Sequence, residues 1–128
     1  MMTYCIIRPT QKPRRFYEET AREYVKRLSR FCKVRYLNDI DKKNERDFVI
    51  QMSPDGTQLS SEEMASRLQR LESAGSYNRI IFSVKEETHF DQKWALTSIN
   101  LPLDLQTVLL LEQIYRAQKI MHNETYHK

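Results

Sequence analysis

The 128-residue sequence contains no apolar run near the roughly 20 residues in succession that a membrane-spanning helix needs. Its first residues also lack the charged and then apolar pattern of a secretory signal peptide. These two absences argue against a membrane protein and against export. We therefore expect a cytoplasmic protein with no membrane partner.

Cysteine is scarce, with two residues in the chain. Cys5 lies in a short apolar run and Cys32 at the end of a helical pattern, and neither has a cysteine or histidine at metal-ligand spacing nearby. His89 and His122 are likewise isolated. We expect two reduced thiols in or near the core, and no metal site.

A chain of this length fits one domain, which we place at residues 1–128. Its formal net charge of +4 lies within the range of ordinary soluble domains, so charge alone identifies no partner. The basic residues are concentrated near the N-terminus, as Arg8, Lys12, Arg14, Arg15, Arg22, Lys26, Arg27, Arg30, Lys33 and Arg35. This segment is either a solvated helix face or a surface that contacts RNA, and the sequence favours neither.

Apolar residues recur with two different periods along the chain. Short apolar or β-branched runs predict strands, whereas apolar residues spaced by three and four predict helices. The predicted strands are residues 4–7, 34–37, 48–52 and 80–84, and the predicted helices are residues 16–31, 60–75 and 105–121. This alternation predicts an α/β fold with a mostly parallel sheet that has helices on both faces.

Turn and capping residues mark several boundaries. The Ser-Pro-Asp-Gly sequence at 53–56 is typical of a turn, and Ser60 with Glu63 forms a capping-box pair at the start of a helix. Asp104 is the expected N-cap of the last helix. The pattern between these helices is weaker, and there we predict a short helix around 90–96 and an extended segment at 97–101.

The last predicted helix is apolar over more than one stripe. A helix that is apolar on two sides needs burial on two sides. In so short a chain, the second side suggests the interface of a homodimer.

The C-terminal sequence carries a motif with defined spacing. Residues 109–117 read Leu-Leu-Leu-Glu-Gln-Ile-Tyr-Arg-Ala, and residues 125–128 read Thr-Tyr-His-Lys. This resembles the end of the RlmH-type 23S rRNA pseudouridine N3-methyltransferases of the SPOUT class, including the spacing between Arg116 and His127. The resemblance implies a C-terminal trefoil knot, a homodimer formed through the knot helices, S-adenosylmethionine as cofactor, and ribosomal RNA or the ribosome as partner.

The resemblance also implies which residues form the site. Three loops would hold S-adenosylmethionine, and the residues that match them are Met52, Glu86, Thr97, Ser98, Ile99, Asn100, Leu101 and Pro102. Arg116, Tyr126 and His127 would meet the substrate at the dimer interface. His127 suits a general base for the N3 proton, Arg116 suits a developing oxyanion or a phosphate, and Tyr126 suits stacking on an unpaired base.

One loop departs from the family pattern. Lys85, Glu86 and His89 stand where the family has a Gly-Gly-x-x-Gly sequence. Larger side chains narrow a pocket that glycines leave open, and Glu86 would repel the carboxylate of the cofactor unless a cation intervened. The chain is also shorter than the family norm near 38–47 and 90–95, which predicts less helical cover over the sheet.

Three functions follow from these conflicting signals. The first is an S-adenosylmethionine-dependent rRNA methyltransferase of the RlmH type. The second is a catalytically degenerate homodimer that binds RNA or the ribosome. The third is a purely structural or interaction protein. An open cavity between the three loops would support the enzyme, whereas a loop folded into that space, with Lys85 or Glu86 filling it, would support the binding protein.

Overall fold

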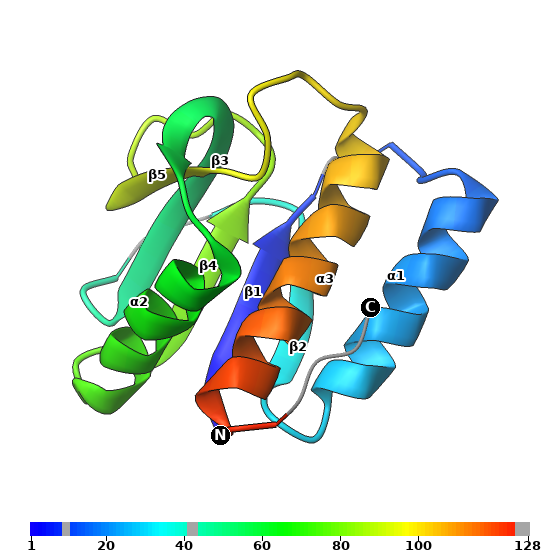
Figure 1. The fold of residues 1–128 in the computed structure, drawn as a ribbon. Helices are drawn as coiled ribbons and strands as arrows, with labels where there is room; N and C mark the ends of the chain where they lie inside the picture. The colour runs from blue at the N-terminus through cyan, green and yellow to red at the C-terminus, as the bar shows by residue number, and fades with distance from the viewer. Residues whose placement is uncertain (9–10, 41–43, 125–128) are drawn as a thin grey trace.

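The computed structural model describes residues 1–8, 11–40 and 44–124 (Figure 1). In chain order, its elements are β1 (Thr3–Ile7), α1 (Arg15–Leu28), β2 (Lys33–Leu37), β3 (Asp47–Gln58), α2 (Ser61–Ser73), β4 (Arg79–Ser83), β5 (Gln92–Ala95) and α3 (Leu103–Met121). Strands and helices alternate over most of the chain, as the hydrophobic periods predict. No helix in these ranges is both long and apolar enough to cross a membrane.

The strands form one five-stranded sheet in the order β2-β1-β4-β3-β5, and every neighbouring pair is parallel. The prediction of a parallel α/β sheet is therefore confirmed. Parallel strands point their carboxyl ends toward the same edge, so the interruption in β3 and the loops after β4 and β5 lie there. The candidate site lies at this edge.

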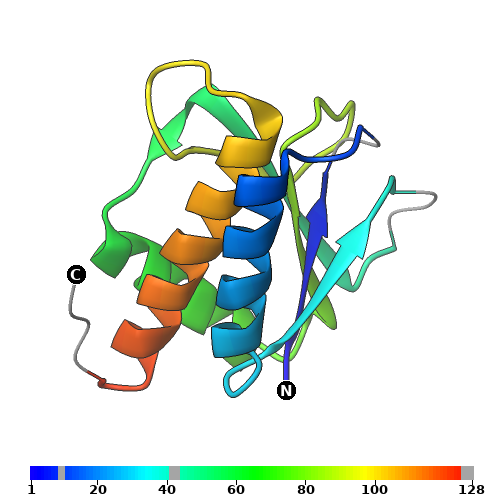
Figure 2. The same ribbon diagram turned by 90° about the vertical axis from the view of Figure 1, so that its right-hand side faces the viewer.

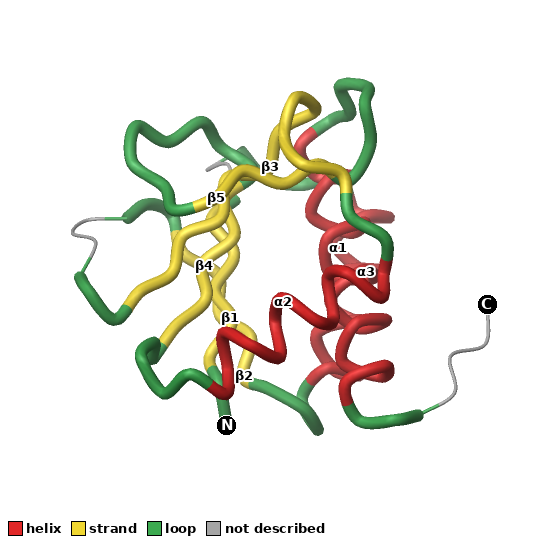
Figure 3. The backbone as a smooth tube through the Cα atoms, turned by 60° about the vertical axis from the view of Figure 1, so that its left-hand side comes forward, coloured by secondary structure: helices red, strands yellow, loops and turns green. Residues whose placement is uncertain are grey.

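The three described helices cover one face of the sheet (Figures 2 and 3). The prediction of helices on both faces is wrong for this part of the chain. The main core lies between the helices and the sheet, whereas Cys5, Ile7, Val49 and Ile81 form a second buried cluster on the other face. Leu37 and Ile40, at the end of β2 and just beyond it, pack against this second cluster. The described residues of the following segment, 38–40 and 44–46, form no helix that could cover this face.

The segment before α3 also differs from the prediction. Residues 92–95 form the edge strand β5 rather than part of a short helix, and residues 97–101 contain no strand. The predicted turn at 53–56 interrupts the pairing of β3 with β5, because Met52 and Thr57 both face Trp94. Pairing with β3 therefore determines the strand conformation of residues 92–95, and the local sequence pattern does not predict this pairing.

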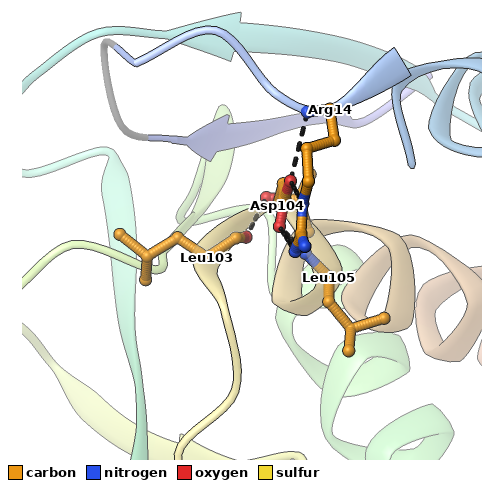
Figure 4. A network of polar contacts seen from close by, with 5 residues as sticks. Arg14, Leu103, Asp104 and Leu105 are labelled. Carbon is orange, nitrogen blue, oxygen red and sulfur yellow. Dashed lines mark hydrogen bonds and ion pairs between the residues drawn. The ribbon is translucent and has the colours of Figure 1, made fainter. Parts of the chain in front are cut away.

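Helix starts follow their capping residues in one case and not in another. At α2, Ser60 accepts from the Glu63 amide at 3.1 Å, while the Glu63 carboxylate accepts from the Ser60 amide at 3.0 Å. At α3, Pro102 takes the N-cap position that we predicted for Asp104. Asp104 lies in the first turn and accepts two hydrogen bonds of 2.9 Å from the Arg14 guanidinium (Figure 4). These bonds, which hold the pKa of Asp104 well below its ordinary value, tie α3 to α1.

The apolar character of α3 has an explanation within one chain. This helix packs against the sheet and lies between α1 and α2, contacting both (Figure 1). Leu110, Leu111, Ile114 and Ala117 are completely buried. Much of the second apolar side therefore faces neighbouring helices, and the pattern does not by itself require a partner chain.

Cys5 and Cys32 are both free and buried, as predicted. Burial and the nearby Glu72 raise the pKa of the Cys32 thiol from 9.0 to about 12. The unfolded chain therefore loses the thiol proton at lower pH than the folded protein, so Cys32 contributes stability that is lost as pH rises from 9 toward 12. At pH 10 this loss should be about 1 kcal/mol.

We expect Cys32→Ala to lose less stability than the native protein between pH 8 and pH 10. Urea unfolding of both proteins at the two pH values measures the difference. Tyr4, whose pKa burial and Glu72 also raise, is present in both proteins, so its alkaline effect cancels in the comparison. Equal losses in the two proteins would contradict a buried, protonated Cys32.

Candidate active site

An open cleft of about 370 Å³ lies at the carboxyl edge of the sheet. The interruption in β3 contributes Met52 and Asp55, the loop after β4 contributes Glu86 and Glu87, and the segment before α3 contributes Asn100. This volume falls within the range of small-molecule sites, and parallel sheets bind ligands at this edge. The fold therefore brings the three predicted loops together around one space.

The predicted cofactor residues divide into three groups. Met52, Glu86 and Asn100 line the cleft. A neighbouring hollow of about 10 Å³ shares Met52 with the cleft and is also lined by Thr97, Ile99 and Leu101. Ser98 and Pro102 line neither of these two spaces, and Pro102 instead caps α3.

A buried side chain holds the loop that lacks the family glycines. Gln51 in β3 is 4% exposed, and its amide nitrogen donates to the carbonyl of Lys85 at 2.7 Å and to that of Ser83 at 3.3 Å. Its amide oxygen accepts from the backbone N–H of Glu87 at 2.6 Å. Gln51 thus fixes both sides of the turn that begins at Lys85.

Lys85 and Ser83 extend this arrangement. The Lys85 ammonium donates to the Asn38 carbonyl at 3.0 Å, and Lys85 does not line the cleft. The Ser83 hydroxyl lies 2.8 Å from the Lys85 carbonyl and 2.6 Å from the Glu87 carboxylate. The loop is therefore held beside the cleft and leaves the space open.

The charged lining of the cleft is mostly acidic. Asp55, Glu86 and Glu87 contribute carboxylates, and Lys93 contributes an ammonium. Hydrogen bonding from Ser53, followed by the charge of Lys93 at 3.4 Å, lowers the pKa of Asp55, which is therefore ionised at neutral pH. A ligand with net positive charge is favoured in such a site.

S-adenosylmethionine fits this lining in three respects. Its sulfonium and ammonium groups suit the carboxylates, its ribose hydroxyls can donate to them, and its adenine can contact the apolar side chains of Met52, Val84 and Leu103. Lys93 is the cation within the lining that can offset repulsion between Glu86 and the ligand carboxylate. The residues present are thus compatible with this cofactor.

Of the predicted substrate residues, the structure describes Arg116, which does not line this cleft within one chain. Arg116 follows the cleft residue Gln106 by ten positions on α3, which is about 15 Å along a helix. Its guanidinium donates to Glu112 at 2.8 Å. Tyr126 and His127 lie outside the described residues.

Several lining residues were missed by the sequence analysis. The sequence predicts Asp55 only as part of a turn, and it predicts Lys93 in a short helix where the structure has β5. The sequence places Gln51 within the apolar strand predicted at 48–52. Gln51 is the polar residue in an otherwise apolar run. This pattern indicates a buried side-chain amide, and a buried amide requires hydrogen-bond partners.

Comparison with known proteins identifies the family. A family model described as "Predicted SPOUT methyltransferase" matches residues 36–127, which is most of the chain and includes all three loops of the cleft. The chain belongs to the SPOUT methyltransferase family.

Individual relatives agree over nearly the full length. The chain is 33% identical to ribosomal RNA large subunit methyltransferase H 1 of Thermoanaerobacter sp. (strain X514), over 99% of this chain and 100% of the relative. It is 30% identical to ribosomal RNA large subunit methyltransferase H of Leuconostoc mesenteroides, over 89% and 92%. A putative methyltransferase H of Methanococcus vannielii is 28% identical over 99% and 100%.

Proposed function

We propose that this protein is an rRNA methyltransferase of the RlmH type, which uses S-adenosylmethionine to methylate N3 of a pseudouridine in large-subunit rRNA. The observation that carries the proposal is the open cleft formed by the three loops at the carboxyl edge of the sheet. The full-length similarity to curated rRNA large subunit methyltransferases supports the same reaction. A protein that methylates ribosomal RNA would act in the cytoplasm.

The cofactor would be held by the lining of the cleft. Met52 would contact the adenine, Asn100 would hydrogen-bond to polar groups of the ligand, and the carboxylates would balance its positive charge. When bound, S-adenosylmethionine supplies a methyl group that its sulfonium makes electrophilic. The apolar side chains Val84 and Leu103 would exclude water from part of this space.

The substrate residues would come from a second copy of the chain. Arg116 is too far along α3 to reach the cleft of its own chain, so a homodimer would bring Arg116, Tyr126 and His127 of one copy to the cleft of the other. His127 would accept the N3 proton, Arg116 would stabilise negative charge, and Tyr126 would stack on the base. The trefoil knot implied by the family resemblance stays a prediction. Sedimentation at twice the 15.4 kDa chain mass would support the dimer.

The alternative of a catalytically degenerate RNA-binding protein has less support. It would require the altered loop to fill the cofactor space. Lys85 instead donates to Asn38, and Glu86 stands at the wall of an open cleft. The larger side chains that replace the glycines therefore do not fill the cleft, and a ligand can enter it.

Calorimetric titration with S-adenosylmethionine tests the proposal. We expect the native protein to bind with a dissociation constant in the micromolar range, about −8 kcal/mol. Asn100→Trp places an indole at the cleft and should abolish the binding.

Ser98→Trp is the matched control, since Ser98 is exposed in the same segment but does not line the cleft. This variant should bind like the native protein. Absence of heat for the native protein at two temperatures would overturn the proposed function, because a silent enthalpy at one temperature does not persist at another.

A further inference from the structure

A second open space, of about 400 Å³, lies between α2 and β5. We call it the arginine groove. Arg67, Arg70 and Leu71 of α2 line it on one side, and Gln92 of β5 lines it on the other. Its described lining contains two cations and no carboxylate, in contrast to the acidic cleft.

The two arginines differ in how they are held. The Arg67 guanidinium donates to the Gln92 amide oxygen at 3.0 Å and lies 5.9 Å from the centre of the Trp94 ring. The indole N–H of Trp94 donates to the same Gln92 oxygen at 2.8 Å. Arg67 is therefore positioned before any ligand binds. Arg70 is exposed and has no ion pair with any residue that the structure describes.

The groove and the cleft lie on either side of one short strand. Gln92 lines the groove and its neighbour Lys93 lines the cleft, and successive side chains of a strand point to opposite faces. β5 is an edge strand, so no further strand of the sheet separates the two spaces. A linear polymer with one residue bound in the cleft can therefore cross β5 and continue into the groove.

We propose that the arginine groove binds backbone phosphates of the substrate RNA next to the nucleotide that enters the cleft. This inference rests on the proposed function and adds the surface that takes the RNA backbone. Guanidinium groups match phosphate oxygens in charge and geometry, and an Arg pair at positions i and i+3 places both on one helix face. Phosphate contacts position an RNA without reading its sequence.

The test is binding of a fluorescein-labelled 20-nucleotide RNA hairpin, measured by anisotropy over a series of salt concentrations. Arg70→Glu should weaken binding about tenfold and reduce the slope of log affinity against log salt by about 1. Arg70→Lys should keep most of the affinity because it keeps the charge. Arg70 makes no ion pair with a residue that the structure describes, so its replacement removes none of the described ion pairs.

Arg35→Glu makes the same change in net charge at an exposed position of β2, the opposite edge strand. Arg35 belongs to the basic N-terminal segment, so this variant compares the groove with the other candidate RNA surface and with a solvated basic face. It should leave the affinity and the salt slope near native values. Equal weakening by Arg35→Glu and Arg70→Glu, or no RNA binding by the native protein, would overturn the groove as an RNA surface. Binding of labelled polyglutamate with the affinity and Arg70 dependence of the hairpin would assign the groove to acidic proteins and also overturn the proposal.

The same variants separate this inference from the proposed function. Arg70 does not line the cleft, so Arg70→Glu should bind S-adenosylmethionine like the native protein. Loss of RNA binding with cofactor binding intact is the expected pair of results. Failure of the native protein to bind the cofactor would contradict the proposed function. In that case, the hairpin measurement would still test whether the arginine groove binds RNA.

Discussion

Gly56→Ala is expected to lower the free energy of unfolding by about 3 kcal/mol, which is roughly 10 °C in melting temperature for a chain of this size. A Cβ at position 56 would lie 2.7 Å from the Trp94 carbonyl carbon and 2.8 Å from that of Lys93. These are backbone atoms of β5, so no side chain can rotate away. The variant must separate β5 from β3, and thermal unfolding followed by circular dichroism measures the cost.

Gly75→Ala is the control for this prediction. Gly75 has a φ of +72°, and a Cβ there would meet nothing within 4 Å. Its replacement costs only the backbone conformation, about 1 kcal/mol. If the two alanine variants melted at the same temperature, the close contact between Gly56 and β5 would be wrong.

Gln51→Met is expected to weaken S-adenosylmethionine binding at least about tenfold and to destabilise the protein by about 3 kcal/mol. Methionine has a similar length but cannot replace the hydrogen bonds to Ser83, Lys85 and Glu87. The loop after β4 would lose its fixed shape beside the cleft. Calorimetry measures the affinity, and hydrogen exchange of the Glu87 amide, which donates to Gln51, measures the order of the loop directly.

Ser83→Ala serves as the comparison for Gln51→Met. It removes a hydroxyl 2.8 Å from the Lys85 carbonyl but leaves the contacts of Gln51 in place. We expect a loss of about 1 kcal/mol and slow exchange of the Glu87 amide. Native exchange at Glu87 in Gln51→Met would show that Gln51 does not hold the loop, whether or not the protein binds the cofactor.

Much of the fold could be predicted from the sequence because the buried apolar residues recur with the period of the helix or strand that contains them. The first, second and fourth strands and the three helices of the described residues lie close to their predicted positions, since apolar side chains recur there at the spacing of each element. β5 could not be predicted. Its residues begin with the polar pair Gln92 and Lys93 and form no apolar or β-branched run, and their strand conformation depends on pairing with β3, which is distant in sequence.

For the candidate site, the loops could be predicted from the sequence but most of the side chains that line the cleft could not. Its three loops came from the resemblance in the C-terminal motif, and the structure gathers those loops around one cleft. The individual side chains were less accessible, because a residue such as Lys93 faces the cleft only once β5 is placed. The same is true of the arginine groove, since Arg67 and Gln92 are 25 positions apart and meet only through tertiary structure.

The cover over the second face of the sheet has a consequence for local unfolding. Cys32 lies in the core between helices and sheet, so its thiol meets solvent only when that core opens. Cys5 belongs to the cluster that no described helix covers. Displacement of the surrounding loops would expose Cys5 while the helices stay in place. The reactivity of the Cys5 thiol should therefore measure a sub-global opening of the sheet face. The reactivity of the Cys32 thiol should measure global unfolding.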